Sequence, residues 1–297
     1  MNIEKIVNNE RMLRSVIWIW VKEFNEILPF FEKSLEEYYR TIKEKRERKV
    51  WWWRKWALWD AKSKLIMILF YVKVYPTYDL MAFLYDVARW QPCYWVQKFL
   101  PVLEKALWRR VVLPERKVWS LEDLLKKYPE VKELFTDWTE RPVNRPKKNK
   151  QQKRNYSWKK KRHTIKNTVV VNENREILFL WNTEEWKIHD KKLYDKENLW
   201  KLDIDNYGDT WYIWWNGIIT PKKNSKKNPL TDEEKETNKI ISSFRVVVEN
   251  WICGIKRFWI VSQKLRNRIY GNYNTVKMNF KDKVMLVSAG LHNLTIR

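Results

Sequence analysis

HTIKNTVVVNENREILFLWN, residues 163–182, is the stretch that decides the fold class of this chain. β-Branched and large apolar residues fill both of its halves, and the polar residues Asn172 to Asn174 separate them. Two such runs joined by a short polar segment are typical of a β-hairpin. Three further short strands are expected at LFTDW (134–138), KLDI (201–204) and GIITPKK (217–223).

Helical patterns flank these strands on both sides. Apolar residues recur at three- and four-residue spacing over residues 1–46. Further helices are predicted over residues 61–74, 78–85, 90–100, 189–199, 231–265 and 284–294. Thr231 is the predicted N-cap of the long helix, which has acidic residues in its first turn. Strands followed by helices predict a mixed α/β fold.

The helices predicted over residues 78–85 and 90–100 raise the question of DNA binding. Residues 86–89 (DVAR) predict a four-residue turn between them, and Pro101 is expected to end or kink the third helix. A helix, a short turn and a helix in a basic context are the layout of a helix-turn-helix, here over residues 61–107. Its second helix would present Gln91, Tyr94 and Gln97 to DNA. An ordinary helical hairpin fits the same pattern equally well.

The charge balance points to a polyanionic partner. The chain has 60 Lys and Arg against 36 Asp and Glu, and its formal net charge is +24. Nucleic acid is the simplest partner for such an excess, although a Lys-rich surface alone is the alternative. Cys93 and Cys253 cannot form a disulfide framework, and the chain has no CxxC pair for zinc. We expect a cytoplasmic, nucleoid-associated protein with no targeting peptide and no membrane span.

The chain has unusually few glycines and unusually many tryptophans. Average glycine usage of about 7% predicts about 21 glycines in a chain of this length. The chain has 5 Gly and 21 Trp, as though the two residues were exchanged. Read literally, WWWRKW (51–56) resembles a stacking platform for single-stranded bases. Read with glycine in place of tryptophan, it becomes a flexible basic hinge within a linker at residues 43–60.

Three acidic residues stand apart by position. Asp137 ends a predicted strand, Asp209 follows the strand near residues 201–204, and Glu249 lies in the long helix. In that helix Arg245, Glu249 and Lys256 fall within about 40° of one another, so they project from one face. This stripe is either a surface ladder of salt bridges or a metal-binding carboxylate between two phosphate-binding cations.

Five stretches carry a resemblance to a known family. They are TDWTERPV (136–143), YSWKKKRHTIKN (156–167), EEWKIHDKK (184–192), GDTWYIW (208–214) and SSFRVVVENWICGIKRF (242–258). In this order they resemble the signatures of DDE-class insertion-sequence transposases, in the group related to Harbinger-type transposases. The resemblance runs from about residue 60 to the C-terminus.

The resemblance implies a fold and a chemistry. It implies a ribonuclease H-like catalytic domain over residues 116–297, preceded by a helical region over residues 1–115 that contains the helix-turn-helix. Asp137, Asp209 and Glu249 would be the catalytic residues and would bind two Mg²⁺ or Mn²⁺ ions. The implied reaction is cleavage at transposon ends, followed by attack of the freed 3′-hydroxyl on target DNA. The implied partners are terminal inverted repeats, target DNA, and further copies of the chain in a homodimer or higher oligomer.

Other positions have expected roles within this resemblance. Arg245 and Lys256 would contact phosphate near the metals or, alternatively, form salt bridges. Lys159, Lys160, Lys161 and Arg162 would form a backbone-contact patch, or else a solvated hairpin rim. His189 and Asp190 match a His-Asp pair of the family and would support the metal ligands, with Asp190 as a third metal ligand the alternative. Asp203 and Asp205 are alternative candidates for the second metal-binding carboxylate. Neither of them is the aspartate of the family's D-x-G-Y pattern when Trp is read as Gly.

Within these motifs the chain differs from the family pattern in one recurring way. Trp138, Trp158, Trp186, Trp211 and Trp214 fall where the family has glycine. Our hypothesis is that the gene reads UGA as glycine, and that most of the printed tryptophans are such codons; a few, such as Trp95, are expected to be true tryptophans. Two other functions remain open: a catalytically inactive or domesticated DNA-binding protein, and a single-strand-binding protein that stacks bases on its tryptophans.

Overall fold

The structure is a computed structural model of the 297-residue chain. It describes residues 3–44, 58–116, 126–188, 192, 206–207, 219–222, 224, 229–266 and 280–297. Of residues 43, 206, 240 and 243–249 only the backbone is described. The helix expected at 189–199, the strand expected at 201–204 and most of the linker at 43–60 lie outside the described residues.

The described part of the N-terminal half contains six helices, in the regions where the apolar spacing predicts helical structure. They are α1 (Ile3–Val7), α2 (Glu10–Ile17), α3 (Val21–Glu44), α4 (Ala61–Val74), α5 (Tyr78–Tyr85) and α6 (Trp90–Arg109). Side-chain caps begin two of them: Asp60 accepts a hydrogen bond from the Ser63 amide at 2.8 Å, and Thr77 accepts one from the Leu80 amide at 3.2 Å. The expected bounds of α4 and α5 are confirmed.

One expectation about α6 is wrong in part. Pro101 does not end this helix, which continues to Arg109. A proline removes one helical hydrogen bond and its ring crowds the carbonyl four residues earlier, but packing of the helix beyond it offsets this cost. The residues that follow Pro101 include Val102, Leu103 and Leu107, which are all buried.

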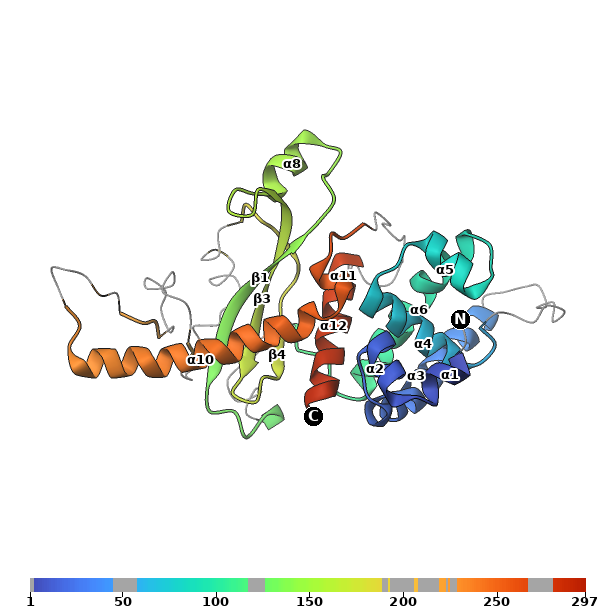
Figure 1. The fold of residues 1–297 in the computed structure, drawn as a ribbon, viewed down its shortest axis with the longest axis horizontal. Coiled ribbons are helices and arrows are strands. Elements are labelled where there is room, and N and C mark those ends of the chain that lie inside the picture. The colour runs from blue at the N-terminus through green and yellow to red at the C-terminus, as the bar shows by residue number, and fades with distance from the viewer. Residues whose placement is uncertain are drawn as a thin grey trace.

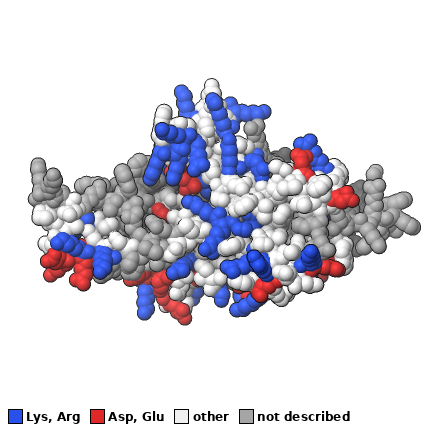
Figure 2. All heavy atoms as spheres, in the orientation of Figure 1, with Lys and Arg blue, Asp and Glu red and all other residues white. Residues whose placement is uncertain are grey.

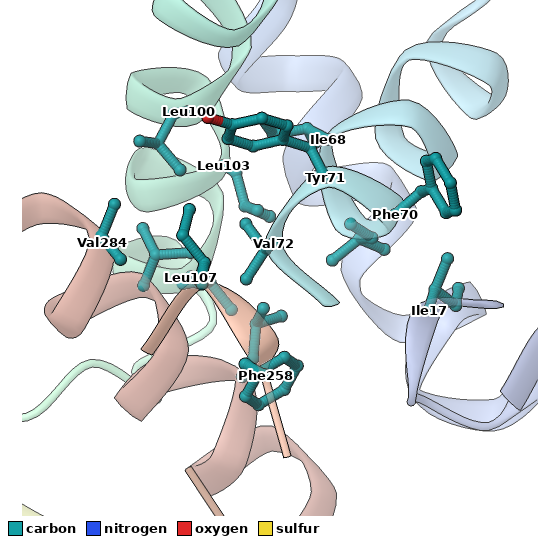
Figure 3. Close-up of a cluster of buried hydrophobic side chains, with 14 of the residues drawn as sticks. Ile17, Ile68, Phe70, Tyr71, Val72, Leu100, Leu103, Leu107, Phe258 and Val284 are labelled. Carbon is teal, nitrogen blue, oxygen red and sulfur yellow. The ribbon is translucent and has the colours of Figure 1, made fainter. Parts of the chain in front are cut away.

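Helix α4 lies at the centre of this half. It is buried nearly all round and packs against α2, α3 and α6. The C-terminal helices α11 (Trp259–Ser262) and α12 (Phe280–Ile296) close the same core. Figure 3 shows side chains of these elements converging, with Phe258 and Val284 from the C-terminal part beside Val72, Leu103 and Leu107. The two ends of the sequence therefore share one hydrophobic core.

A twisted sheet forms the second half of the molecule (Figure 1). Its strands are β1 (Leu134–Pro142), β2 (Tyr156–Ser157), β3 (Arg162–Asn172), β4 (Ile177–Leu180), β5 (Glu184–Glu185) and β6 (Asn206–Tyr207). β1 and β3 pair antiparallel over nine residues, and β3 pairs antiparallel with β2, β4 and β5. β6 pairs with β1 in parallel. The expected hairpin at 163–182 is confirmed as β3 and β4.

Strand β1 is longer than the sequence indicates. LFTDW predicts five residues, whereas the strand extends through Glu140 and Arg141 to Pro142. The extension is stabilised by pairing along its whole length with the longer strand β3, and local sequence does not reveal this long-range pairing. Of the strand expected at 217–223, the described part shows Ile219 bridged in parallel to Tyr207.

The long helix α10 (Asp232–Lys256) begins as predicted. Thr231 and Glu234 form a capping box, in which each side chain accepts a hydrogen bond from the backbone of the other. The helical stretch expected over 231–265 is broken at Phe258, whose backbone is extended, and α11 follows. α10 packs against β1 and α12, and Figure 1 shows it crossing the sheet.

One tryptophan occupies a backbone position that suits glycine. Trp18 caps the C-terminus of α2 in the left-handed conformation with φ 66°, and its amide bonds to the Arg14 carbonyl. Glycine is the usual residue at this position because it has no Cβ to clash. This backbone is what the hypothesis expects at Trp18, whereas Trp138, Trp158 and Trp186 do not have a positive φ.

Candidate active site

Asp137 lies near the middle of β1, which is the central strand of the sheet. Its partner in the antiparallel register is Val169 of β3, and its side chain is half-buried. Oδ1 of Asp137 accepts a hydrogen bond of 2.7 Å from the backbone amide of Trp138. Residues on a strand alternate between faces, so Asp137 shares its face with Phe135 and Arg141.

Strand β6 lies beside β1 on the edge opposite β3. Leu134 pairs with Asn206, and Phe135 pairs with Tyr207. The rings of Phe135 and Tyr207 stack, with centroids 5.7 Å apart and planes at 21°. Asp209 lies outside the described residues. It follows Tyr207 by two positions, as Asp137 follows Phe135 by two positions.

The acid-bearing helix packs on the face of the sheet that carries Asp137. Trp251 and Ile255 of α10 belong to the same core cluster as Val169 and Val171, which share the face of Asp137. Glu249 lies in the regular part of α10, but its side chain and that of Arg245 are outside the described atoms. Lys256 is exposed, whereas Trp251 and Ile255 are buried, so the side of α10 that carries Lys256 is turned away from the core.

The described atoms alone do not assemble a metal site. Among the described residues there is no group of three His, Cys, Asp or Glu side chains that could hold a metal ion. Of the three expected ligands, only the Asp137 side chain is described. Strand β1, which carries Asp137, nevertheless pairs with β6, which ends two residues before Asp209 in the sequence, and packs against α10, which carries Glu249.

The expected backbone-contact patch lies at the far end of the sheet from α10. Lys159, Lys160, Lys161 and Arg162 are all exposed at the tight turn between β2 and β3. Lys161 has a left-handed backbone, with φ 50°. The amide of Lys160 donates a hydrogen bond of 3.3 Å to Oγ of Ser157. His189 and Asp190 lie outside the described residues.

The three residues expected to read DNA lie in the first half of α6. Tyr94 is 43% exposed and packs edge-on against Trp90. The Gln91 side chain accepts a hydrogen bond of 2.9 Å from the Ala88 amide, at the start of α6. The Gln97 amide group donates to Sγ of Cys93 at 3.4 Å. Tyr94 is thus on the surface. The side chains of Gln91 and Gln97 are hydrogen-bonded to residues within α6 or just before it.

Sequence reasoning missed a buried polar network next to the candidate site. Arg141 is 2% exposed, and its Nη2 lies 2.9 Å from Oδ1 of Asn167, 3.0 Å from Oγ1 of Thr183 and 3.1 Å from the Lys281 carbonyl. Burial lowers the pKa of Arg141 to about 10, against the opposing effect of the negative charge of Asp282.

Asp282, at the start of α12, connects this network to the loop after β4. Oδ1 of Asp282 accepts a hydrogen bond from the Thr183 amide and lies 3.6 Å from Nη2 of Arg116. Burial lowers the pKa of Arg116, and the charge of Asp282 acts in the opposite direction. The network therefore ties β1 and β3 to α12. The only sequence feature that distinguished Arg141 was its position within the motif TDWTERPV.

Comparison with known proteins assigns the class. Residues 136–293 match the family described as DDE superfamily endonuclease, over a span that begins beside Asp137 in β1 and ends in α12. This is more than half of the chain, so the chain belongs to that family. The resemblance to DDE-class insertion-sequence transposases is thereby confirmed.

One curated relative is similar over much of its length. It is described as "Probable transposase for insertion sequence element IS702", from Microchaete diplosiphon. The two sequences are 28% identical over 215 residues, which cover 70% of this chain and 74% of the relative. No solved structure matches the chain. Within the part of the chain that the structure describes, no helix has the length and apolarity needed to cross a membrane.

Proposed function

We propose that this chain is a metal-dependent DNA transposase that cleaves the ends of an insertion sequence and joins the freed 3′-hydroxyl to target DNA. The observation that carries the proposal is the register between β1 and β6. Phe135 and Tyr207 pair side by side, and two residues beyond each of them stand Asp137 and Asp209. If the parallel ladder continues for those two residues, both carboxylates lie on one face of the sheet.

The third carboxylate is supplied by the helix that covers this face. Glu249 lies in α10, which packs against β1 and shares a core cluster with Val169 on the Asp137 face. Helix geometry places Glu249 on the side of α10 that carries the exposed Lys256, away from the buried Trp251 and Ile255, so the proposal requires its carboxylate to reach the Asp137 face past the edge of the helix. Three carboxylates gathered at one point repel one another unless cations lie between them, and oxygen-only ligands suit Mg²⁺ or Mn²⁺. Asp137, Asp209 and Glu249 would hold two such ions. When bound, these ions supply activation of the attacking oxygen and stabilisation of the leaving oxygen.

The remaining residues of the site would bind and orient DNA. Arg245 and Lys256 share one stripe of α10 with Glu249, where they would contact the phosphates on either side of the cut. His189 and Asp190 would orient the carboxylate ligands. The strand order β4-β3-β1-β6, with only the last pair parallel, supports a ribonuclease H-like domain over residues 116–297.

The N-terminal helices would bind the terminal repeats. Helices α4, α5 and α6 pack on one another within residues 61–107 of the helical region, which we place at 1–115, and the surface position of Tyr94 supports α6 as the DNA-reading helix. Gln91 and Gln97 would have to exchange their present hydrogen bonds for contacts with bases. We also propose that the active complex on DNA contains two or more copies of the chain and assembles on the nucleoid in the cytoplasm.

A cleavage assay tests the nuclease proposal. The substrate is a linear duplex that contains one end of the element, taken from the sequence just outside the gene, incubated with Mg²⁺. Asp137→Ala, Asp209→Ala and Glu249→Ala are each expected to lower the cleavage rate by about 100-fold or more, because each removes a ligand of the ions that stabilise the transition state.

Two neighbouring acids provide matched controls. Asp203→Ala and Asp205→Ala remove carboxylates from the same segment as Asp209 and are expected to leave cleavage within a few-fold of the parent. Equal cutting by the parent and by Asp137→Ala would overturn the mechanism. Binding of the element end by a parent that never cuts it would favour the alternative function, an inactive or domesticated DNA-binding protein.

A further inference from the structure

Between β1 and β3 the chain forms a projecting element that the family chemistry does not require. Residues 144–163, called the prong below, comprise a loop, the short helix α8 (Asn149–Asn155), β2 and the tight turn into β3. Figure 1 shows α8 at the end of the β1–β3 ribbon, beyond the body of the sheet.

The prong has an extreme charge composition. Ten of its 20 residues are Lys or Arg and none is acidic, so it carries +10 of the chain's net charge of +24. All ten cations are exposed. They are Arg145, Lys147, Lys148, Lys150, Lys153, Arg154, Lys159, Lys160, Lys161 and Arg162. Figure 2 shows Lys and Arg side chains gathered at the end of the molecule where Figure 1 places α8.

Few of these cations are neutralised by the protein itself. Within the described part of the chain, Arg154 alone of the ten forms an ion pair, with Glu185 at 3.5 Å. Elsewhere the surface mixes the two signs; α3, for example, contributes Glu26 and Glu37 to salt bridges with arginines of α6 and its C-cap. Like charges held this close repel one another and destabilise the folded state unless a polyanion binds them.

The prong is nevertheless a defined structure rather than a loose tail. β2 pairs with β3, and the Val143 amide donates to the His163 carbonyl at 2.9 Å. Gln152 of α8 accepts a hydrogen bond from Nε of Arg145 at 2.9 Å and donates to the Pro146 carbonyl at 2.8 Å. The backbone that carries the ten cations is therefore held in a defined conformation, which lowers the entropy cost of binding an extended anion.

The base of the prong also has a positive potential. The pKa of His163 lies below its ordinary value, first because of burial and then because of the positive charges of Arg145 and Lys264. Lys264 belongs to the segment after α11, in which Leu265 pairs with Val143 at the end of β1. The cationic surface thus continues from the prong onto the end of the sheet.

The direction of β1 sets the distance between the prong and the candidate active site. Pro142, the last residue of β1, lies five positions after Asp137, which at about 3.4 Å per residue places it about 17 Å from Asp137, and the prong begins two residues further on. Successive phosphates of one DNA strand advance by about 3.4 Å along the helix axis, so this distance corresponds to about five base pairs.

We propose that the prong binds the phosphate backbone of duplex DNA, about five or more base pairs from the bond that is cut. The position relative to the cut rests on the proposed nuclease function, whereas the binding itself does not. The cations of α8 and of the β2–β3 turn would follow the backbone of the flanking duplex. Lys147, Lys150 and Lys153 are the residues that distinguish this proposal, because they lie outside the patch of Lys159 to Arg162.

Salt-dependent binding tests the prong. The full-length chain is titrated with fluorescent element-end duplex in EDTA at several salt concentrations. The triple variant Lys147→Gln, Lys150→Gln, Lys153→Gln is expected to bind at least about 10-fold more weakly at low salt. Its slope of log affinity against log salt is expected to be shallower by about 2 to 3, since each lost phosphate contact removes about 0.9.

Two matched variants separate charge from structure. Lys126→Gln, Lys127→Gln, Lys132→Gln removes three exposed cations from the segment before β1, at the other end of the sheet, and is expected to bind like the parent. Lys147→Arg, Lys150→Arg, Lys153→Arg keeps the charge and is expected to retain the salt slope. A prong variant with the same slope as the parent would overturn the proposal, and so would preference of the parent for single strands over a duplex of equal length.

The position of the contact has its own readout. Shortening the duplex to fewer than about five base pairs on the prong side of the cut is expected to abolish the difference between parent and prong variant. A parent that binds DNA through the prong but does not cleave would refute the nuclease proposal alone. A parent that cleaves equally well with and without the prong charges, at unchanged salt slope, would refute the prong alone.

Discussion

Phe135 of β1 and Tyr207 of β6 stack nearly parallel, with ring centroids 5.7 Å apart, although 71 residues separate them in the sequence. Their backbones pair in parallel, so the two side chains project from the same face of the sheet. This contact aligns the segment that leads to Asp209 with the strand that carries Asp137. The alignment makes the proposed active site testable without any catalytic assay.

A disulfide cross-link measures the alignment. In a background with Cys93→Ser and Cys253→Ser, the pair Asp137→Cys and Asp209→Cys is expected to form a disulfide under mild oxidation. Neighbouring strands lie about 4.8 Å apart, which is within the Cα separation of about 4.4–6.8 Å that a disulfide spans. Peptide mass spectrometry after non-reducing digestion identifies the bond.

The rival acids are the control for this cross-link. Asp137→Cys combined with Asp203→Cys is expected to remain reduced under the same conditions, because an offset of six residues would place the thiols about 20 Å apart along an extended strand. Cross-linking of residue 203 in place of residue 209 would show that the register between β1 and the segment around β6 is different and that the second carboxylate was assigned wrongly.

The buried Arg141 network is expected to be essential for stability. Arg141→Met removes the guanidinium from Asn167 and Thr183 and leaves Asp282 less compensated. Breaking one partner out of a buried charged network costs about 3 kcal/mol in the free energy of unfolding. Urea denaturation measures this loss. The exposed Arg162→Met, on β3 of the same sheet, is expected to change the free energy of unfolding by less than about 0.5 kcal/mol.

Several features of the fold were predictable because they depend on short-range physics. The capping box at Thr231 and the start of α4 at Asp60 follow from side chains that accept hydrogen bonds from amides two or three residues later. The hairpin at 163–182 follows from its two apolar runs and its polar turn. Family membership was likewise predicted from five ordered motifs and is confirmed by the match over residues 136–293.

The features that were missed depend on contacts between distant segments. Arg141 gives no local sign of being buried, because its partners come from β3, from the loop after β4 and from α12. The full length of β1 depends on nine residues of pairing with β3, and the continuation of α6 past Pro101 depends on packing. Of the candidate site, the sequence predicts which elements carry the acids, and the register between β1 and β6 comes only from the structure.

Acid is expected to destabilise the protein through His292. This side chain is 8% exposed on α12 and packs closely on Gly254 of α10, where a Cβ would lie 2.4 Å from Cε1 of the imidazole. Burial lowers the pKa of His292 to about 4, the Arg175 carbonyl acts in the opposite direction, and the charge of Arg257 lowers it further. In the unfolded chain the pKa is about 6.5.

The folded protein therefore holds His292 neutral at a pH where the unfolded chain already protonates it. The stability is complete above about pH 6.5 and is lost progressively as the pH falls toward 4. Between pH 7 and 5 the parent is expected to lose about 2 kcal/mol more than His292→Gln, measured by urea denaturation. An equal loss in both proteins would show that other groups cause the acid sensitivity.

The tryptophan hypothesis predicts opposite outcomes at two kinds of position. Trp158 is 75% exposed and stands at a position where the family pattern has glycine. Trp95, by contrast, is 4% exposed and packs edge-on against Tyr85 in the core. Replacing Trp138, Trp158, Trp186, Trp211 and Trp214 together by glycine is expected to increase soluble yield and cleavage activity. Trp95→Gly is expected to lose about 3 kcal/mol or more in the free energy of unfolding, because it leaves a large cavity.

The same set of variants separates the hypothesis from base stacking. A single-strand-binding protein that stacks bases on tryptophan would lose about 1–3 kcal/mol of affinity for each stacking ring removed, so the five-glycine variant would bind single strands far more weakly. If these positions are glycine in the natural protein, the five-glycine variant is expected to lose no such affinity for single strands. The codons give an independent readout: TGA at most of the 21 tryptophan positions is expected, and TGG throughout would leave the exchange of glycine for tryptophan without this explanation.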